Sequence, residues 1–587
     1  MVTTTLVTTA MESTWPKEGP VLFLGSWCCS FSRRSYWSSL DAEMVSYHWD
    51  DRSKLRKDYD NLELIYEHFL DMFSKGLNSF HHTSFSNRFW RILIGPWLYT
   101  CIQIVFDRWS VLVAATESQS SISMNAIIND IGFLATYDMD QFNKAIETDE
   151  WNEALFSFLA AEIFRSKILI NYVNKPMAEI QRTGGPRRKK LKAILMKFSN
   201  AVSGFFCRST DVFFIGSHLP FLRQVKILAT FRQIPAFWFR PAKKFSYTYS
   251  RKARNKLSLS CDLGVLPEFE RVLENTLMNL IPACYLEGFS DLLQDSTCQG
   301  WPENPKAIFT SNSYSSDEVF KCWAGSRVDS GSKLVIGQHG GNFGMTPMAI
   351  HESHQIKIAD RWLSWGWEKH SEPKIVPVGN FKLKFNALKH DPAGNALIVS
   401  MTLPRYSYYL YSVPIAGQLN RYFDDQLCFM DSLDESIKKK ILVRMYPEDR
   451  GWNQKMRWQH YRSDIRFDNS NQTLLKSLSK SRIFVGTYNA TTYLETFSVN
   501  MPTILFWDPY FWEINAESHF YFERLKEVKV FHETPQCAAK HLVKIWDDVD
   551  AWWFSSEVQA AVKDFLDTFS KENMAINKTI VDVIANS

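Results

Sequence analysis

A glycine-rich loop with one histidine, Lys333–Gly344 (KLVIGQHGGNFG), follows a short apolar run. Glycines let a backbone approach a ligand closely. His339 stands at the rim of this loop, and histidine is the side chain whose pKa suits proton abstraction from a hydroxyl near neutral pH. A structural histidine that caps a tight turn is the alternative. The other candidate ligand contacts of this loop are Gln338, Gly340, Gly341 and Asn342.

A second loop of similar design lies at residues 483–495 (IFVGTYNATTYLE), where an apolar strand pattern passes into a helix pattern. Its hydroxyls and the free N–H groups of the helix N-terminus suit an anion, and Glu495 is placed to accept hydrogen bonds from ribose hydroxyls. Ordinary helix capping by Thr487 or Asn489 would explain the loop without a ligand. The predicted contacts are Gly486, Thr487, Tyr488, Asn489, Thr491, Thr492 and Glu495.

Two arginines end neighbouring strand patterns in the same half of the chain. Arg444 closes the pattern ILVR, and Arg405 lies in the loop SMTLPRYS together with Thr402. A guanidinium at a strand end can clamp a phosphate or diphosphate. We therefore predict that Arg444, Arg405 and Thr402 face an interdomain cleft.

The segment from Met348 to Asp360 concentrates other titratable side chains. His351 and His354 share a helical face, but the spacing H-E-S-H is not the HExxH zinc motif, so a polar helix surface is expected and no metal site is predicted. Glu352 and Asp360 are the carboxylate candidates for a catalytic role. The ten cysteines show no CxxC pair, which favours a reduced, cytoplasmic protein.

The elements that must position these residues alternate between strand and helix. The pattern predicts a strand at 307–314, a Ser-capped helix at 315–325 and a strand at 332–340. A second such series begins near Asn395. This order predicts parallel sheets, in which ligands gather at the carboxyl ends of the strands. The fold class is thus α/β, with two Rossmann-like parallel-sheet domains facing a cleft.

The predicted domains follow from these patterns. The N-terminal Rossmann-like acceptor domain covers 1–375 and carries a large helical insertion at about 60–280. A linker at 376–385 leads to a nucleotide-sugar-binding Rossmann-like domain at 386–545, and helices at 546–587 close the fold. No internal repeat is evident.

Composition restricts the partners. The net charge of +4 gives no argument for nucleic acid. The N-terminus lacks the pattern of a signal peptide, and the apolar run at 92–106 is short for a bilayer span. Two segments could contact a membrane surface, although a solvated face and a buried helix pair are the simpler explanations. These are the basic segment at 184–192 and the aromatic segment at 212–244.

Several motifs carry a resemblance to a known family: LVTTAMESTW, PVLFLGSWC, YHWDDRSKLRKDY, RFWRILIGPWLYTCIQIVFDRW, VIGQHGGNFG and LPRYSYYLYS. With them the chain resembles transferases encoded in bacterial O-antigen and surface-carbohydrate clusters, of the GT-B glycosyltransferase type. The resemblance implies a fold of two Rossmann-like domains with C-terminal closing helices.

More distantly, the chain is similar to CDP-glycerol glycerophosphotransferases and Kdo transferases. That similarity implies His339, followed by Gly340, as the base, and Glu495 as a ribose ligand. The phosphate-holding basic-x-His-Pro element of those relatives is matched only in part, because Tyr446 stands where they have histidine. This departure weakens the phosphate role of that loop and leaves Arg444 as its best residue.

The leading hypothesis is a metal-independent glycosyltransferase of surface-polysaccharide synthesis that uses a nucleotide-activated sugar, such as a CMP-Kdo-like donor, as its substrate and needs no cofactor. The acceptor would be a glycan or lipid-linked glycan, and the protein would work in the cytoplasm or peripherally at the inner face of the plasma membrane. One alternative is a CDP-polyol phosphotransferase. Another is a non-catalytic scaffold of a polysaccharide assembly complex.

Overall fold

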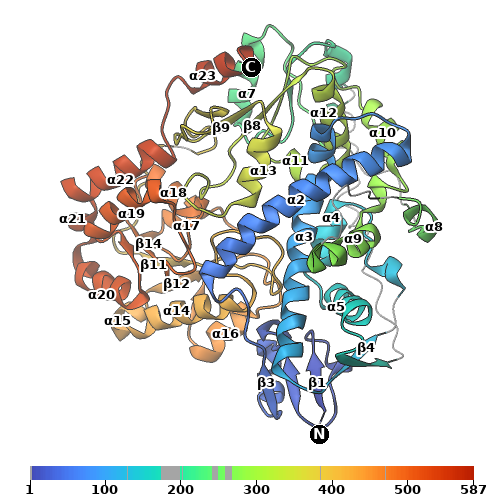
Figure 1. Cartoon of the computed structure of the whole chain (residues 1–587). Coiled ribbons are helices and arrows are strands. Elements are labelled where there is room, and N and C mark those ends of the chain that lie inside the picture. The colour runs from blue at the N-terminus through green and yellow to red at the C-terminus, as the bar shows by residue number, and fades with distance from the viewer. Residues whose placement is uncertain are drawn as a thin grey trace.

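The computed structural model describes residues 3–127, 130–173, 199–200, 202–240, 247, 249–257, 259, 267–383, 385–469 and 471–587. Within these residues the strands form sheets of five, five and six strands, and neighbouring strands are parallel in each of them (Figure 1). The basic segment 184–192 lies outside the described residues.

The first sheet is built by the N-terminal 173 residues in the order β3-β2-β1-β4-β5. Short β-branched and apolar runs pair here, with Leu6 opposite Leu22 on one side and Met124 on the other. The strands are β1 (Thr4–Val7), β2 (Val21–Phe23), β3 (Ala42–Met44), β4 (Ile122–Ile127) and β5 (Ile168–Val173). Helix α5 (Asp149–Ile163) connects the last two strands.

Two long helices leave this sheet and pass beside the second one. Helix α2 (Arg52–His81) begins at an Asp51 cap, and helix α3 (Asn87–Ser118) begins at a Ser86 cap. Helix α3 is long and apolar enough to span a membrane, but nearly all of its apolar stretch is buried inside the protein. It packs against α2, α12 and α13, so its apolar length serves the core.

The second sheet has the order β10-β9-β8-β7-β6. Its strands are β6 (Phe213–Phe214), β7 (Ala307–Thr310), β8 (Lys333–Gly337), β9 (Arg361–Ser364) and β10 (Ile375–Pro377). Helices α12 (Glu318–Asp329) and α13 (Ile350–Ile358) connect β7 to β8 and β8 to β9. The predicted βαβ unit is present, with Asp317 rather than a serine as the cap of α12.

Two further helices before β6 are α1 (Arg34–Trp37) and α4 (Met139–Ala145). Between β6 and β7 lie α7 (Phe221–Thr230), α8 (Arg251–Arg254), α9 (Glu268–Leu280) and α10 (Phe289–Thr297), and α11 (Ser313–Ser316) follows β7. Of these, α9 packs on α3 and α10 packs on α12.

The third sheet, of order β13-β12-β11-β14-β15-β16, forms the C-terminal half. Its strands are β11 (Asn395–Val399), β12 (Ile441–Arg444), β13 (Arg466–Phe467), β14 (Ser481–Gly486), β15 (Thr503–Phe506) and β16 (Phe531–His532). Its helices are α14 (Leu419–Asp431), α15 (Glu435–Lys438), α16 (Gln454–Tyr461), α17 (Leu474–Leu478), α18 (Thr491–Ser498), α19 (Ala516–Glu527) and α20 (Pro535–Ile545).

The chain ends in α21 (Val549–Trp553), α22 (Ser556–Phe569) and α23 (Ile576–Ala585). After α22 it returns to the second sheet, where Lys571 N–H donates to the Trp365 carbonyl at 2.7 Å and Asn380 N–H to the Lys571 carbonyl at 2.8 Å. Helix α23 then packs on α7 (Figure 1). The last helices therefore join the two sheet domains.

The fold class is α/β, with parallel sheets and C-terminal closing helices, as predicted. The domain scheme needs correction. Residues 1–375 contain two parallel sheets instead of one, and strands β4, β5 and β6 lie inside the interval 60–280 that was expected to be a helical insertion. The predicted linker 376–385 begins inside β10. Pairing of β1 with β4 joins residues more than 100 positions apart, which local patterns cannot reveal.

Candidate functional site

The two loops singled out in the sequence touch each other. The loop after β8 carries Gly341, and a Cβ atom added there would lie 2.5 Å from Thr491 Cα and 2.7 Å from Thr491 N, at the start of α18. Backbone atoms cannot give way as a flexible side chain can. A glycine is therefore required at position 341, and its absent side chain allows the second and third sheets to meet.

His339 is half-buried beside this contact. Its ring lies 5.3 Å from the ring of Phe343 and 6.3 Å from that of His218, and its Nδ1 atom is buried without a hydrogen-bond partner among the described residues. Burial, together with the positive potential of His351, His218 and Lys382, lowers the pKa of His339 to about 3. The imidazole is neutral at physiological pH and has a free nitrogen.

A cavity of about 390 Å³ lies next to His339. Its walls come from both sheet domains, with His351 and Asn342 on one side and Tyr409 and Tyr411 on the other. The rings of His351 and Tyr409 are 4.2 Å apart, and Tyr99 Oη lies 2.8 Å from His351 Nδ1. Burial lowers the pKa of His351 to about 4. Two neutral histidines therefore face one small interdomain space.

Gln338 and Glu352 hold the His339 loop in place. The Gln338 side chain accepts hydrogen bonds from Trp365 N–H (2.8 Å) and Trp367 Nε1 (3.0 Å), and its amide donates to the Gly340 carbonyl at 2.7 Å. Glu352 accepts the Gly344 N–H at 2.7 Å, and burial raises its pKa to about 7. Both predicted residues thus shape the loop and do not line the cavity.

Asp360 lies at the amino-terminal end of the strands, away from the end where the His339 loop begins. It precedes β9, where it accepts hydrogen bonds from Leu334 N–H (2.8 Å) at the start of β8 and from Arg88 (2.8 Å). Burial opposes its ionisation, but the Arg88 hydrogen bonds outweigh that effect and lower the pKa of Asp360. The His339 loop leaves the opposite end of β8, so Asp360 is an ion-pair residue of the scaffold.

The loop before α18 is only partly available to a ligand. Gly486 packs on Leu505, and buried Thr487 donates to the Val399 carbonyl at 2.9 Å. Asn489 accepts from Tyr493 at 3.0 Å, but its buried Nδ2 has no partner in the described part of the chain. The half-buried members of the predicted set are Tyr488, Thr491, Thr492 and Glu495. The N-cap position of α18, Ala490, contributes no side-chain hydrogen bond.

The two arginines predicted to bind phosphate form ion pairs with carboxylates of the protein instead. Arg444 pairs with Asp468 and donates to the Gln472 carbonyl at 2.7 Å. Arg405 donates to the Trp27 carbonyl (2.7 Å) and to Asp149 (2.6 Å), both in the N-terminal sheet unit. Thr402 is buried and its hydroxyl is 3.5 Å from the Leu403 carbonyl. Arg405 therefore joins the third sheet domain to the N-terminal unit, whereas Arg444 and Thr402 bind within their own domain.

Lys382 places a positive charge beside His339, whereas Arg444 and Arg405 do not. Its Nζ donates to the His339 carbonyl at 3.2 Å, and its charge acts on Glu495, whose pKa burial raises. Lys382 lies in the crossing between the sheet domains, and His218 follows β6, so neither stands in a recognisable motif. The position of Lys382 inside the predicted interdomain linker 376–385 was the only signal in the sequence. The described residues contain no cluster of three or more His, Cys, Asp or Glu able to hold a metal.

Gly341→Ala tests the backbone contact. We expect the added methyl group to destabilise the protein by about 1–3 kcal/mol or more, because both neighbours are backbone atoms. Gly340→Ala is the matched control, since its Cβ would lie 3.9 Å from Phe343 Cζ. Thermal unfolding of both variants measures the difference, and equal melting temperatures would contradict the contact.

The buried neutral state of His339 predicts a pH effect on stability. Below pH 6.5 the unfolded chain protonates this histidine, whereas the folded chain does so only near pH 3. Stability from this group is complete above pH 6.5 and falls with decreasing pH, by up to about 1.4 kcal/mol per pH unit. His339→Gln should therefore lose less stability than the wild type between pH 6 and 4.5. His370→Gln, at an exposed position, should follow the wild type in the same melting series.

Comparison with protein families matches residues 4–584 to the family described as LIC12162 family transferase. No curated protein matches the sequence. Solved structures with partial likeness include a UDP-N-acetylglucosamine 2-epimerase from Rickettsia bellii, at 11% identity and a TM-score of 0.30, covering 51% of this chain and 81% of its own.

Two glycosyltransferase structures show a similar degree of likeness. The spinosyn rhamnosyltransferase SpnG, complexed with spinosyn aglycone, aligns at 11% identity and a TM-score of 0.25 over 51% of this chain and 77% of its own. WaaG, a glycosyltransferase involved in lipopolysaccharide biosynthesis, aligns at 8% identity and a TM-score of 0.26 over 51% of this chain and 96% of its own. The family match, in contrast, spans nearly the whole chain, and this protein belongs to the LIC12162 family of transferases.

Proposed function

We propose that this transferase is a glycosyltransferase that moves a sugar from a nucleotide-activated donor to a hydroxyl of a glycan or lipid-linked glycan. The observation that carries the proposal is the position of neutral His339 beside the start of α18, with Gly341 in backbone contact with Thr491. The base and the anion-favouring N-terminus of α18 are thus connected by a backbone contact two residues from His339.

The reaction follows from this placement. The acceptor hydroxyl oxygen attacks the anomeric carbon of the donor while the bond from that carbon to the nucleotide phosphate breaks. His339 takes the hydroxyl proton. The negative charge that grows on the leaving phosphate is stabilised by the amide groups at the start of α18 and by Lys382. Lys382 replaces Arg444 and Arg405 in this role, because both arginines are bound elsewhere.

Inversion of configuration is the stereochemistry that the residues favour. A double-displacement mechanism needs a carboxylate at the anomeric carbon, and the two carboxylates predicted for it are engaged. Asp360 pairs with Arg88 at the amino-terminal end of the strands, and Glu352 accepts a hydrogen bond from the Gly344 N–H. Glu495 lies on α18, where it is better placed for a donor ribose. A CMP-activated acidic sugar of the Kdo type remains our proposed donor class, as a substrate with no separate cofactor.

The donor site is tested by thermal shifts with CMP, CDP, UMP, UDP and GDP. A ligand at 100 times its Kd stabilises the folded state by about 2.7 kcal/mol. We expect one nucleotide base to stand out, and Lys382→Met to weaken that shift. Lys389→Met, exposed in the same crossing segment, is the matched control. A panel without any shift would favour the scaffold hypothesis.

The role of His339 is tested by turnover of the identified donor. His339→Gln should lower kcat by roughly 10²–10⁴-fold, the usual contribution of a general base, with the nucleotide shift retained. Phosphorus NMR of the product separates the chemistries, since a glycosyltransferase releases the nucleotide and a polyol phosphotransferase forms a new phosphodiester. Full activity of His339→Gln would remove the proposed base.

We also propose a peripheral contact with anionic membrane at the start of α7. The exposed side chains there include Phe205 (83% exposed), Phe206, Phe221 (63%) and Leu222 (70%). Phe221 stacks on Phe237 at 4.6 Å, and the Phe237 backbone is hydrogen-bonded to Ser203. The exposed basic residues nearby in sequence are Lys226 and Arg232. Aromatic side chains with adjacent cations suit the headgroup region of a bilayer, at the inner face of the plasma membrane.

Vesicle flotation tests this surface. The wild type should float with vesicles of phosphatidylglycerol and phosphatidylethanolamine and much less with phosphatidylcholine alone. Replacing Phe205 and Phe206 by serine should abolish flotation, whereas Phe520→Ser, at another exposed aromatic, should not. Equal flotation of all variants would show that this surface is not the contact.

A further inference from the structure

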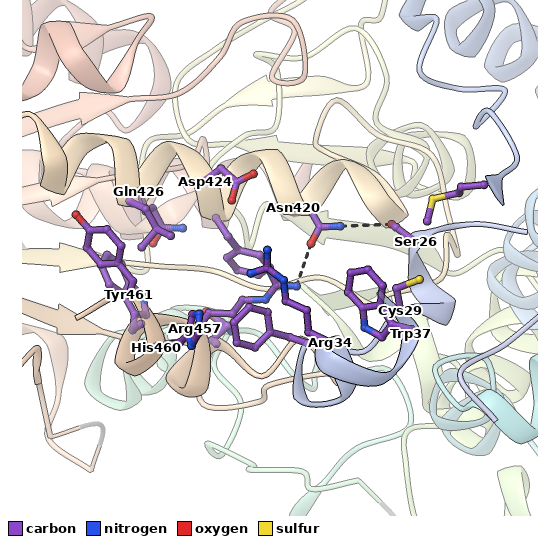
Figure 2. A pocket seen from close by; sticks show the side chains of 16 residues that line it. Ser26, Cys29, Arg34, Trp37, Asn420, Asp424, Gln426, Arg457, His460 and Tyr461 are labelled. Atoms are coloured by element: carbon purple, nitrogen blue, oxygen red, sulfur yellow. Dashed lines mark hydrogen bonds between the residues drawn. The ribbon is translucent and has the colours of Figure 1, made fainter. Parts of the chain in front are cut away.

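A second cavity lies outside the His339 region. It has a volume of about 500 Å³, within the range of small-molecule sites, and shares no lining residue with the cavity at His339. One wall follows β2 of the N-terminal sheet, and the other consists of α14 and α16 of the third sheet domain. Figure 2 shows Asn420 bridging these walls, with hydrogen bonds to Ser26 (3.4 Å) and Arg457 (3.0 Å).

Gln454 is the polar group of this cavity that lacks partners. Its side chain is 3% exposed, and neither Oε1 nor Nε2 has a hydrogen-bond partner among the residues that the structure describes. A buried amide without partners has lost its hydrogen bonds to water without a replacement, which destabilises the folded state. Because Gln454 lines the cavity, a ligand carrying both a donor and an acceptor would satisfy it.

Arg457 provides a cation that no carboxylate of the described residues contacts directly, while the charges of Asp424 and Asp449 act on it from a greater distance. Its guanidinium lies between Phe31 (4.6 Å to the ring centroid) and Phe423 (5.2 Å), and it donates to the Trp452 carbonyl at 2.9 Å. No carboxylate within the described ranges forms an ion pair with it, and burial lowers its pKa. A partly desolvated guanidinium is a strong site for a single carboxylate.

Another part of the lining is apolar or aromatic. Trp37 and Tyr461 are half-buried, Trp458 is buried, and Leu427 completes this side. Flat apolar surfaces of this kind pack against the C–H faces of sugar rings, while the amide and guanidinium groups meet the hydroxyl and acid groups.

Phosphate is a poorer match than carboxylate. The backbone N–H groups at the start of α16 are already capped, since the Asp449 carboxylate accepts from Asn453 and Gln454 N–H at 2.7 Å each. An exposed carboxylate, Asp424, also lines the cavity, and its charge acts on Arg457 and on the exposed cation Arg34. A dianionic phosphate would find one guanidinium and no free amide cradle.

We propose that this cavity is a second saccharide site, which binds a sugar ring carrying one carboxylate. Arg457 holds the carboxylate, Gln454 exchanges hydrogen bonds with ring hydroxyls, and Trp37 and Trp458 contact the ring faces. Binding here needs neither His339 nor turnover, so the site stands independently of the proposed glycosyl transfer.

Saturation-transfer NMR on the full chain tests the proposal with a matched pair of probes. Methyl β-glucuronide and methyl β-glucoside differ only by the carboxylate. The glucuronide should bind at least about tenfold more tightly, as expected for one charge-assisted hydrogen-bond pair. Arg457→Met should remove this preference. Arg421→Met, an exposed arginine on α14 that pairs with Asp425, should leave it unchanged.

Gln454→Glu is the second variant, in case Arg457→Met fails to fold. It keeps the size of the side chain and places a competing carboxylate in the cavity, so glucuronide binding should fall at least about tenfold. His339→Ala should bind the glucuronide like the wild type. Equal binding of glucuronide and glucoside, no binding of either, or tighter binding of UMP or inorganic phosphate that depends on Arg457 would each overturn the proposal.

Discussion

A contact between two backbones organises the proposed active site. Gly341 lies against the first residue of α18 with no space for a side chain, so the separation of the second and third sheets is set by main-chain atoms. The loop on one side is braced by Gln338 and Glu352, and Asn515, the cap of α19, donates to the Gly344 carbonyl at 2.8 Å. Rigid positioning of this kind holds a base and a helix N-terminus in fixed geometry.

The electrostatic design of the two cavities differs. Around His339 the titratable groups are neutral, because burial lowers the pKa values of His339 and His351 and raises that of Tyr409. Positive charge comes from Lys382 and from the partial charge at the N-terminus of α18. The second cavity instead contains a guanidinium that forms no direct ion pair within the described residues, that of Arg457. The first arrangement suits proton transfer and a charge that forms during reaction, and the second suits a charge that the ligand brings with it.

The local sequence pattern was sufficient to predict the strand–loop–helix units and to select the two loops, because each of these depends on residues close in sequence. It failed where orientation depends on distant partners. Arg444 and Arg405 do follow strands, but Asp468 and Asp149 turn their guanidinium groups away from the cleft. The separate N-terminal sheet was missed because β1 pairs with β4 across the long helices α2 and α3. Lys382 and Gln454 belong to no motif, and only their surroundings in the fold identify them.

The N-terminal sheet also has a mechanical consequence. Enzymes with two facing domains commonly open and close about a hinge. Here Arg405 fastens the third sheet domain to Asp149 and Trp27, and Arg52, on α2, pairs with Glu513 of that domain at 2.6 Å. Helix α3 meanwhile packs on α12 and α13 of the second sheet. The first sheet unit therefore spans both halves, so wide domain opening would break buried ion pairs. Substrate entry by movement of individual loops costs less in this molecule than rotation of a whole domain.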